Sequence, residues 1–127
     1  MDAKFHLTSR FQASLKRSKH SVDRCLGDLK TVLAVNPEFG VPIPKYSKLR
    51  KMRVRVPHLN LGKSGGYRLI YRRSIIDEIQ YIVFLEIYFK GDKEDLSASE
   101  YQRIVAESEK IVTKILDYDW VDAPRFG

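Results

Sequence analysis

The sequence predicts an α+β domain, in which an N-terminal helical hairpin and a C-terminal helix pack on a small antiparallel sheet. Two observations lead to this class: apolar residues at helical spacing near both ends of the chain, and alternating, strand-like segments between them. In chain order the elements are one strand, two helices, three strands and one helix, which is typical of an α+β fold. The 127 residues fit a single domain, 1–127.

The first third of the chain predicts a strand and two helices. Lys4 to Leu7 alternate in polarity as an edge strand does, and Thr8 or Ser9 is expected to cap the first helix. Ser21 is expected to cap a second helix, which ends at Asn36-Pro37. The apolar positions at helical spacing are Phe11 and Leu15 in the first helix, and Val22, Leu26, Leu29 and Leu33 in the second.

A loop and a basic strand are predicted next. Residues 36–47, NPEFGVPIPKYS, hold three prolines and one glycine, so we expect a loop there. Met52 to Val56 then alternate cleanly, with Arg53 and Arg55 on the polar side. Extended backwards, the same alternation places an arginine on the apolar side, so we expect a β-bulge near Arg50-Lys51.

Two further strands are predicted, and they differ in how they are covered. The first has Tyr67, Leu69 and Tyr71 on one face and Arg68, Ile70 and Arg72 on the other. Gly65-Gly66 precedes it and provides the positive φ with which the chain enters the strand. Residues 81–89, YIVFLEIYF, are apolar on both faces, which indicates a central strand that is covered on both sides.

The last third predicts one helix and a tail. Ser97 and Glu100 have the spacing of a capping box at the helix start. The apolar stripe of this helix comprises Tyr101, Ile104, Val105, Ser108, Val112 and Ile115. Residues 117–127 are acidic and aromatic, and either pack on the sheet or are loosely attached.

Positive charge is concentrated in one part of the chain and indicates a polyanionic partner. The net charge is +7, but residues 1–73 carry 17 Lys and Arg against 4 Asp and Glu, whereas residues 74–127 carry 6 against 12. No acidic residue occurs between Phe39 and Ile76. A solvated surface normally mixes both signs, so this stretch favours a phosphate-binding face over an acidic protein partner or a merely basic surface.

Several classes of function are disfavoured by the composition. The single Cys25 cannot form an internal disulfide or supply a zinc-ligand pair, so we expect no metal and no other cofactor. The longest apolar run, residues 81–85, is far shorter than the roughly 20 residues of a membrane helix, and a cytoplasmic location is expected. The segment NLGKSGGY lacks the spacing of a phosphate-binding P-loop.

The arginines and tyrosines are suited to metal-independent cleavage of RNA. RNA carries its own nucleophile, the 2′-hydroxyl beside the scissile phosphate, so a protein can hold the nucleotide for in-line attack and stabilise the developing charge. Arginine binds phosphate oxygens with a planar fork, and tyrosine stacks on unpaired bases. The side chains that the predicted strands place for this are Arg53, Arg55, Arg68, Arg72, Tyr88 and Lys90.

Four segments, in order, resemble the RelE/HigB branch of the RelE/ParE toxin superfamily: NPEFGVPIP, LRKMRV, GKSGGYRLIYR and IYFKGDKEDLSASE. The resemblance runs from about Phe5 to Leu116. It implies a microbial-RNase-like RelE fold and the toxin of a type II toxin–antitoxin system. Such a toxin is a ribosome-dependent mRNA endoribonuclease, or mRNA interferase, which cuts mRNA in the ribosomal A site, inhibits translation, takes part in stress responses and is neutralised by a cognate antitoxin.

The resemblance also implies roles for individual residues. Arg68 matches the arginine that stabilises the scissile phosphate, and Lys90 the basic position after the central strand. With Tyr88, these are the expected catalytic residues. The expected RNA-binding residues are Lys51, Arg53, Arg55, Lys63, Tyr67 and Arg72.

The sequence departs from the family pattern at the proton-transfer positions. Some members place a tyrosine near the start of the last helix, where this chain has Leu96-Ser97, and others use histidine near the C-terminus, where it has none. Tyr88, Lys90 and Asp92 are the substitutes that the chain offers as general base. The alternative function is a ParE-like gyrase inhibitor, or an inactive homologue that only binds an antitoxin.

Overall fold

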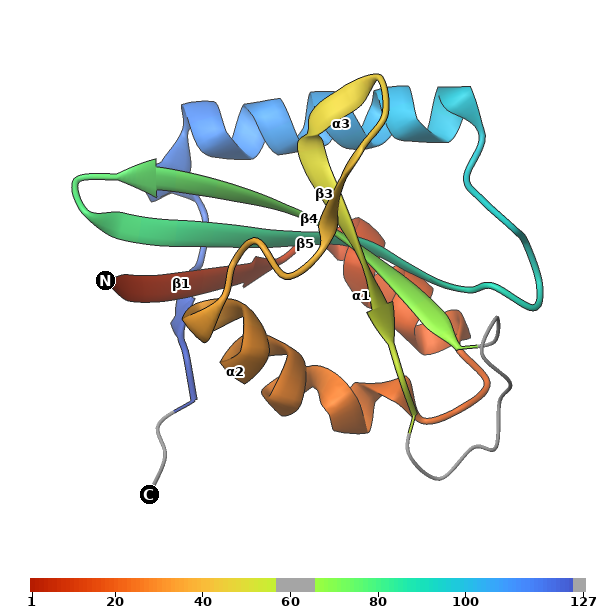
Figure 1. Ribbon diagram of the computed structural model, residues 1–127. Coiled ribbons are helices and arrows are strands. Elements are labelled where there is room, and N and C mark those ends of the chain that lie inside the picture. Colours follow the sequence, from red (N-terminus) through yellow and green to blue (C-terminus); the bar gives the residue numbers. More distant parts are fainter. Residues whose placement is uncertain (57–65, 125–127) are drawn as a thin grey trace.

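The computed structural model in Figure 1 describes residues 1–56 and 66–124. The sheet has six strands in the order β2-β3-β4-β5-β1-β6. The elements along the chain are β1 (Asp2–Leu7), α1 (Ser9–Arg17), the 3-10 helix η1 (Val22–Cys25), α2 (Leu26–Val35), β2 (Val41–Ile43), β3 (Tyr46–Val54), β4 (Tyr67–Ile76), β5 (Ile79–Phe89), α3 (Ala98–Thr113), the 3-10 helix η2 (Ile115–Asp117) and β6 (Val121–Asp122).

Helices cover both faces of this sheet, and each face has its own core. In Figure 1, α3 lies along one face, and α2 lies on the other. Phe5, Phe11, Leu33 and Phe84 are fully buried in the core beneath α1 and α2. On the α3 face the core comprises Ile43, Leu49, Ile70, Val83, Leu85, Tyr88, Leu96, Tyr101, Ile104 and Ile111. The predicted α+β class, with a helical hairpin and a C-terminal helix on one sheet, is confirmed.

The sheet is mixed and not antiparallel as predicted, because β1 pairs with β5 in parallel while the other pairings are antiparallel. As predicted, β5 is central. β1 is not the edge strand, since β6 pairs along its outer side. Beyond Leu7, α1 takes the place of β1 beside β5, and the hydroxyl of Ser14 accepts a hydrogen bond from the backbone N–H of Ile87 at 3.1 Å.

In the basic region, the predicted loop is wrong in part, and the predicted bulge is absent from the β3–β4 pairing but has a counterpart in the β2–β3 pairing. Part of the expected loop is a strand, Val41–Ile43, which is possible because Pro42 sits on an edge strand, where its missing N–H removes no essential ladder bond. β3 pairs with β4 without interruption through Arg50 and Lys51, so no bulge separates them in that pairing. The register does shift beside Arg50 in the pairing with β2, between Pro42 and Ile43, and a second irregularity lies in β5, opposite Ile70 and Tyr71.

The predicted helix caps are compared with the residues at which the helices begin. Thr8 accepts a hydrogen bond from the N–H of Phe11, and Ser97 forms a complete capping box with Glu100, so both predictions are confirmed. Ser21 precedes a 3-10 turn and makes no side-chain cap, so that prediction is wrong. Gly66 has the expected positive φ, 92°.

The described part of the tail packs on the sheet. Val121–Asp122 pair with β1, and the indole N–H of Trp120 donates to the carbonyl of Ile115. Trp120 also contacts the rings of His6 and Tyr81. Within residues 1–56 and 66–124, no helix is both long enough and apolar enough to cross a membrane.

Candidate nucleic-acid interface

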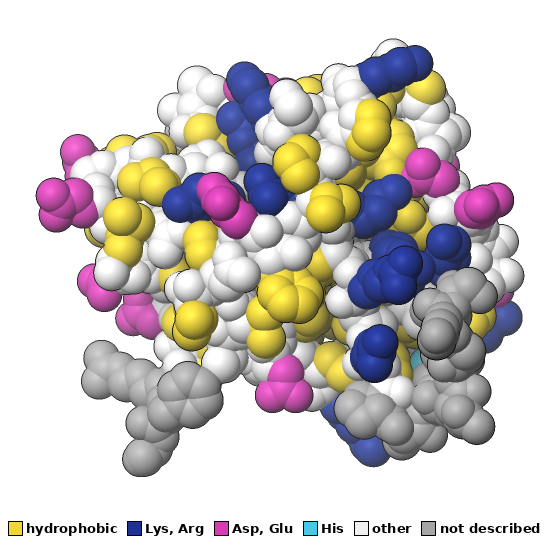
Figure 2. All heavy atoms as spheres, in the orientation of Figure 1, with side chains coloured by type: hydrophobic (Ala, Val, Ile, Leu, Met, Phe, Trp, Pro, Cys, Tyr) yellow, Lys and Arg dark blue, Asp and Glu magenta, His cyan; other side chains and the backbone are white. Residues whose placement is uncertain are grey.

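Arg53, Arg68 and Tyr88 form one row across three neighbouring strands. In the sheet register, Arg68 lies opposite Arg53 on one side and opposite Tyr88 on the other. Directly opposite residues on adjacent strands point to the same face, so the three side chains share the α3 face of the sheet. Figure 2 shows Lys and Arg side chains gathered on the right of the molecule, where this end of the sheet lies.

Arg68 is a buried cation with few hydrogen-bond acceptors around it among the described residues. The residue is 5% exposed, and its Nη1 donates to the carbonyl of Tyr67 at 3.2 Å. Its Nη2 has no hydrogen-bond partner among the described residues. Burial and the neighbouring Arg53 lower the pKa of Arg68, but a guanidinium stays charged in proteins. A buried charge of this kind is costly unless an anion reaches it, so the position is suited to binding one.

Tyr88 adds a second unsatisfied donor beside Arg68. It is 7% exposed, and its hydroxyl is without a hydrogen-bond partner in the described part of the chain. Burial raises the pKa of Tyr88, although Lys51 and Arg68 oppose that shift. The phenol is therefore protonated at neutral pH. It can donate a hydrogen bond to a phosphate oxygen, and it is unsuited to removing a proton.

Lys51 lies beside this row on the same face of the sheet, and it contacts the carboxylate of Asp95 and the ring of Tyr101. Its Nζ lies 2.9 Å from Asp95 Oδ1 and 5.6 Å from the ring centre of Tyr101, which also donates its hydroxyl to Asp95. Burial acts to lower the pKa of Lys51, but hydrogen bonds to Tyr101 and Asp95 outweigh it and the pKa is raised. Lys51 is thus a fixed positive charge rather than a base.

The remaining predicted residues fall into three groups. Arg55 is exposed just after β3, and Lys90 follows β5, where its backbone N–H donates to the carbonyl of Gly66 at 3.0 Å. Both lie at the same end of the sheet as Arg68. Lys63 lies outside the described residues.

Tyr67 and Arg72 are placed away from this row. Tyr67 is 2% exposed on the opposite face, where its hydroxyl lies 2.6 Å from Nδ1 of His20 and its ring packs on Phe89. Arg72 shares the face of Arg68, but it donates to the hydroxyl of Ser108 and to Glu109 at 2.8 Å. Both therefore have structural roles, and we leave them out of the candidate interface.

Sequence reasoning missed the contribution of Asp95 and Tyr101. From the sequence, no role is assigned to Asp95, and Tyr101 is placed only in the apolar stripe of the last helix. Tyr101 does pack in that core, with its ring stacked on Tyr46 at 5.0 Å, but its hydroxyl reaches the charged pair. The acidic residue just before a capping box, near a basic strand, was the available signal.

Comparison with known proteins supports the architecture. No protein-family model matches the chain. Among solved structures, the E. coli toxin RelE, as an arginine-to-alanine double mutant in the free state, has a TM-score of 0.55 and 17% sequence identity. The alignment covers 84% of this chain and 98% of that one. The chain therefore has the fold of the RelE toxin.

Proposed function

We propose that this protein is the toxin of a type II toxin–antitoxin system and cleaves mRNA in the ribosomal A site without a metal. The observation that carries the proposal is the juxtaposition of two buried donors, Nη2 of Arg68 and the hydroxyl of Tyr88, neither of which has a partner among the described residues. They lie at one end of a basic sheet with a RelE fold. A phosphate group would satisfy both.

The proposed reaction uses the RNA as its own nucleophile. The 2′-hydroxyl loses its proton to a base, and its oxygen attacks the adjacent phosphorus to form a 2′,3′-cyclic phosphate. The bond from phosphorus to the 5′-oxygen breaks, that oxygen takes up a proton and leaves as a 5′-hydroxyl, and negative charge builds on the non-bridging oxygens in the transition state. Arg68 and Tyr88 donate hydrogen bonds to those oxygens, and Lys51 adds a fixed positive charge. Because Arg68 is 5% exposed, binding requires the side chains that cover it to move aside.

The pKa directions separate charge stabilisation from proton removal. Burial raises the pKa of Tyr88 and of Tyr101, and internal hydrogen bonds raise that of Lys51, so all three hold their protons near neutrality. None of them is suited to accept the proton of the 2′-hydroxyl. We therefore assign them to binding and charge stabilisation, and assign the general base to a group outside this row.

Partners follow from the same proposal. The substrate is mRNA on the ribosome, in the cytoplasm, and the inhibitor is a cognate antitoxin. An acidic, partly disordered antitoxin segment that folds across Arg53 and Arg55 would cover the approach to Arg68.

The test is to induce the protein in cells and map the ends of mRNAs, for the wild type and for Arg68→Ala. Arg73→Ala is the matched control, because Arg73 follows Arg68 on the same strand but binds Glu38 and Gln80. We expect cleavage within codons by the wild type and the control, and none by Arg68→Ala. Intact mRNA together with undiminished toxicity of Arg68→Ala would overturn the proposal, and inhibition of purified gyrase would support the alternative.

A further inference from the structure

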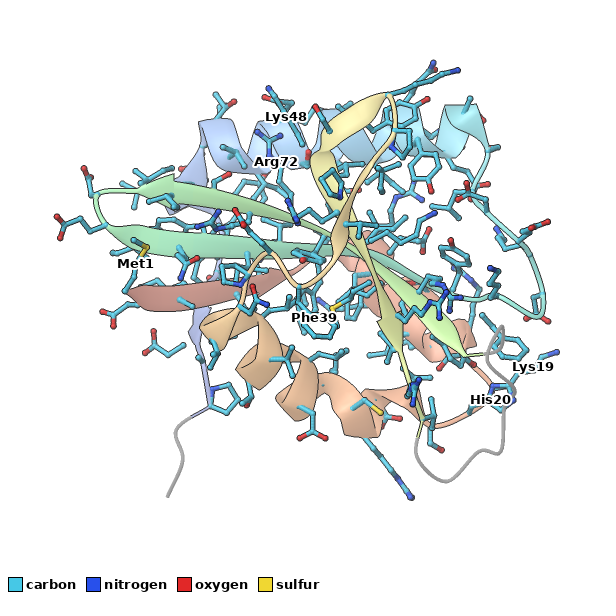
Figure 3. All side chains as sticks on the ribbon, in the orientation of Figure 1. Met1, Lys19, His20, Phe39, Lys48 and Arg72 are labelled. Carbon is cyan, nitrogen blue, oxygen red and sulfur yellow. The ribbon has the colours of Figure 1, made fainter. Side chains whose placement is uncertain are left out.

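A second hollow lies beside the row, on the other side of β5. Its volume is about 220 Å³, and it opens between α1, β5 and the segment that leads into α3. Its main lining residues are Arg10, Ser14, Arg17, Glu86, Tyr88 and Leu96. Lys19, also at its rim, is labelled in Figure 3.

Glu86 is the unusual residue of this hollow. It is 4% exposed, and Oε1 accepts a hydrogen bond from Arg10 Nη1 at 3.1 Å. Oε2 has no hydrogen-bond partner in the described structure, and Nη2 of Arg17 stays 3.9 Å away. A buried carboxylate oxygen without a donor is costly, so a ligand that brings an N–H group would be favoured here.

The surroundings of Glu86 select among ligands. A simple cation would be repelled by Arg10 and Arg17, and a simple anion by Glu86 itself. A nucleotide meets both requirements, because its phosphate is negative and an amino-bearing base supplies N–H donors. The aromatic rings of Tyr88 and Phe89 in the wall add flat surfaces against which a base can pack.

We propose that this hollow binds the base of a nucleotide next to the scissile phosphate, with Glu86 Oε2 accepting a hydrogen bond from its exocyclic amino group. The proposal rests on the proposed nuclease function. It predicts a preference for guanine, adenine or cytosine over uracil at one position, since uracil has no amino group.

The position of Tyr88 connects the hollow to the proposed phosphate site. Tyr88 lines the hollow and lies directly opposite Arg68 in the sheet register. Adjacent strands are about 4.8 Å apart. A single nucleotide can therefore place its phosphate at Arg68 and its base across β5, near Glu86.

The test compares RNAs that differ by cytosine or uracil at one position, on either side of the cut, since these bases differ mainly in one amino group. The readouts are the cleavage rate on ribosomes and the affinity for 2′-deoxy, non-cleavable oligonucleotides. We expect the wild type to favour cytosine at one position by about 5-fold to 150-fold, the range of one good base contact. Glu86→Gln should lose this preference, because an amide can pair with either base.

Glu107→Gln is the matched control. Glu107 also pairs with Arg10, through Nε at 3.4 Å, but it does not line the hollow. Its variant should keep the preference, which separates base recognition from loss of a partner of Arg10.

The outcomes distinguish the two proposals. No preference at any position in the wild type, or an unchanged preference in Glu86→Gln, would overturn the base site even if cleavage is normal. A preference in binding without any cleavage would keep the base site and refute the nuclease. If Glu86→Gln does not fold, the cytosine-to-uracil ratio of the wild type decides alone.

Discussion

β3 and β4 supply arginines to two regions that differ in how the charges are satisfied. In the paired cluster, defined as Lys48, Arg50, Arg72 and Arg73, every cation has an acceptor within the protein. Arg72 and Lys48 bind Glu109 at 2.8 and 2.9 Å, and both are labelled in Figure 3. Arg73 binds Glu38, and Arg50 donates to the carbonyl of Gly40.

In the open cluster, defined as Arg53, Arg55 and Arg68, the described residues supply one acceptor, the carbonyl of Tyr67, which takes a single hydrogen bond from Arg68. None of the three forms an ion pair with any residue of the ranges 1–56 and 66–124. The same two strands thus carry arginines that hold the fold together and arginines whose charge is left for a ligand. Charge density along the sequence is similar in both, so the positions of the neighbouring acceptors, carboxylates and backbone carbonyls, separate the two clusters.

The largest expected effect is on catalysis at Arg68. Arg68→Gln should lower the rate of mRNA cleavage on ribosomes by about 100-fold to 1000-fold, the loss typical of one donor to a developing oxyanion. Its melting temperature should change little, because among the described residues the only acceptor lost is the carbonyl of Tyr67. Arg68→Lys should not restore the rate, since a single ammonium cannot replace the fork.

The matched substitution in the paired cluster is Arg72→Gln, on the same strand and face. It should cleave within a few-fold of the wild type. Equal losses of activity in the two variants would remove the distinction between the clusters.

The next effect is on stability, where a substitution in the paired cluster should cost more than one in the open cluster. Arg72→Met should lower the free energy of unfolding by about 2 kcal/mol, because it removes charge-assisted hydrogen bonds to Ser108 and Glu109. Arg53→Met, at an exposed position, should stay within about 0.5 kcal/mol of the wild type. Urea denaturation measures both, and a larger loss in Arg53→Met would contradict the assignment.

The contrast also shows what the sequence could and could not predict. Alternation correctly placed Arg68 and Arg72 on one face of β4, because side-chain direction in a strand has a period of two. It could not distinguish them, because the partners of Arg72 come from the middle of α3, more than thirty residues later. Packing between distant elements decides which arginine is neutralised.

The differences between the predicted and the observed fold have a similar origin. The strand Val41–Ile43 was missed because prolines oppose a central strand and say nothing against an edge strand. Arg50 on the apolar side predicts a bulge, but the β3–β4 pairing stays regular there and the register shifts on the other side of β3, toward β2. The guanidinium of Arg50 is satisfied by the carbonyls of Glu38 and Gly40. Caps such as Thr8 and Ser97 were predictable because their contacts are local.

A smaller effect on stability and cleavage is expected at Asp95, which forms an ion pair with Lys51 next to the open cluster. Burial acts to raise the pKa of Asp95, but hydrogen bonds from Tyr101, Lys51 and the N–H of Leu96 lower it. Its stabilising contribution is therefore present above the ordinary aspartate pKa, about 3.9, and is lost as pH falls through the lower folded value.

Asp95→Asn should accordingly flatten the loss of melting temperature below about pH 4. Cleavage at neutral pH should fall by no more than about fivefold, since a partly exposed ion pair contributes roughly 0.2 to 1 kcal/mol. Glu94→Gln is the control, because Glu94 is a neighbour of Asp95 that forms no ion pair within the described residues. If the melting temperature of Asp95→Asn falls with acid as steeply as that of the wild type, other groups fix the position of Lys51.

The smallest expected effect concerns the salt dependence of RNA binding. Each phosphate contact on a single strand contributes about 0.7 to the slope of log affinity against log salt. Arg53→Gln and Arg55→Gln should each reduce the slope by about that amount, because both side chains are exposed and without a carboxylate partner in the described structure. Arg73→Gln should leave it unchanged, since Glu38 already neutralises Arg73. Fluorescence anisotropy with a labelled RNA between about 50 and 200 mM salt measures the slopes, and equal changes in all three variants would mean that RNA contacts both clusters alike.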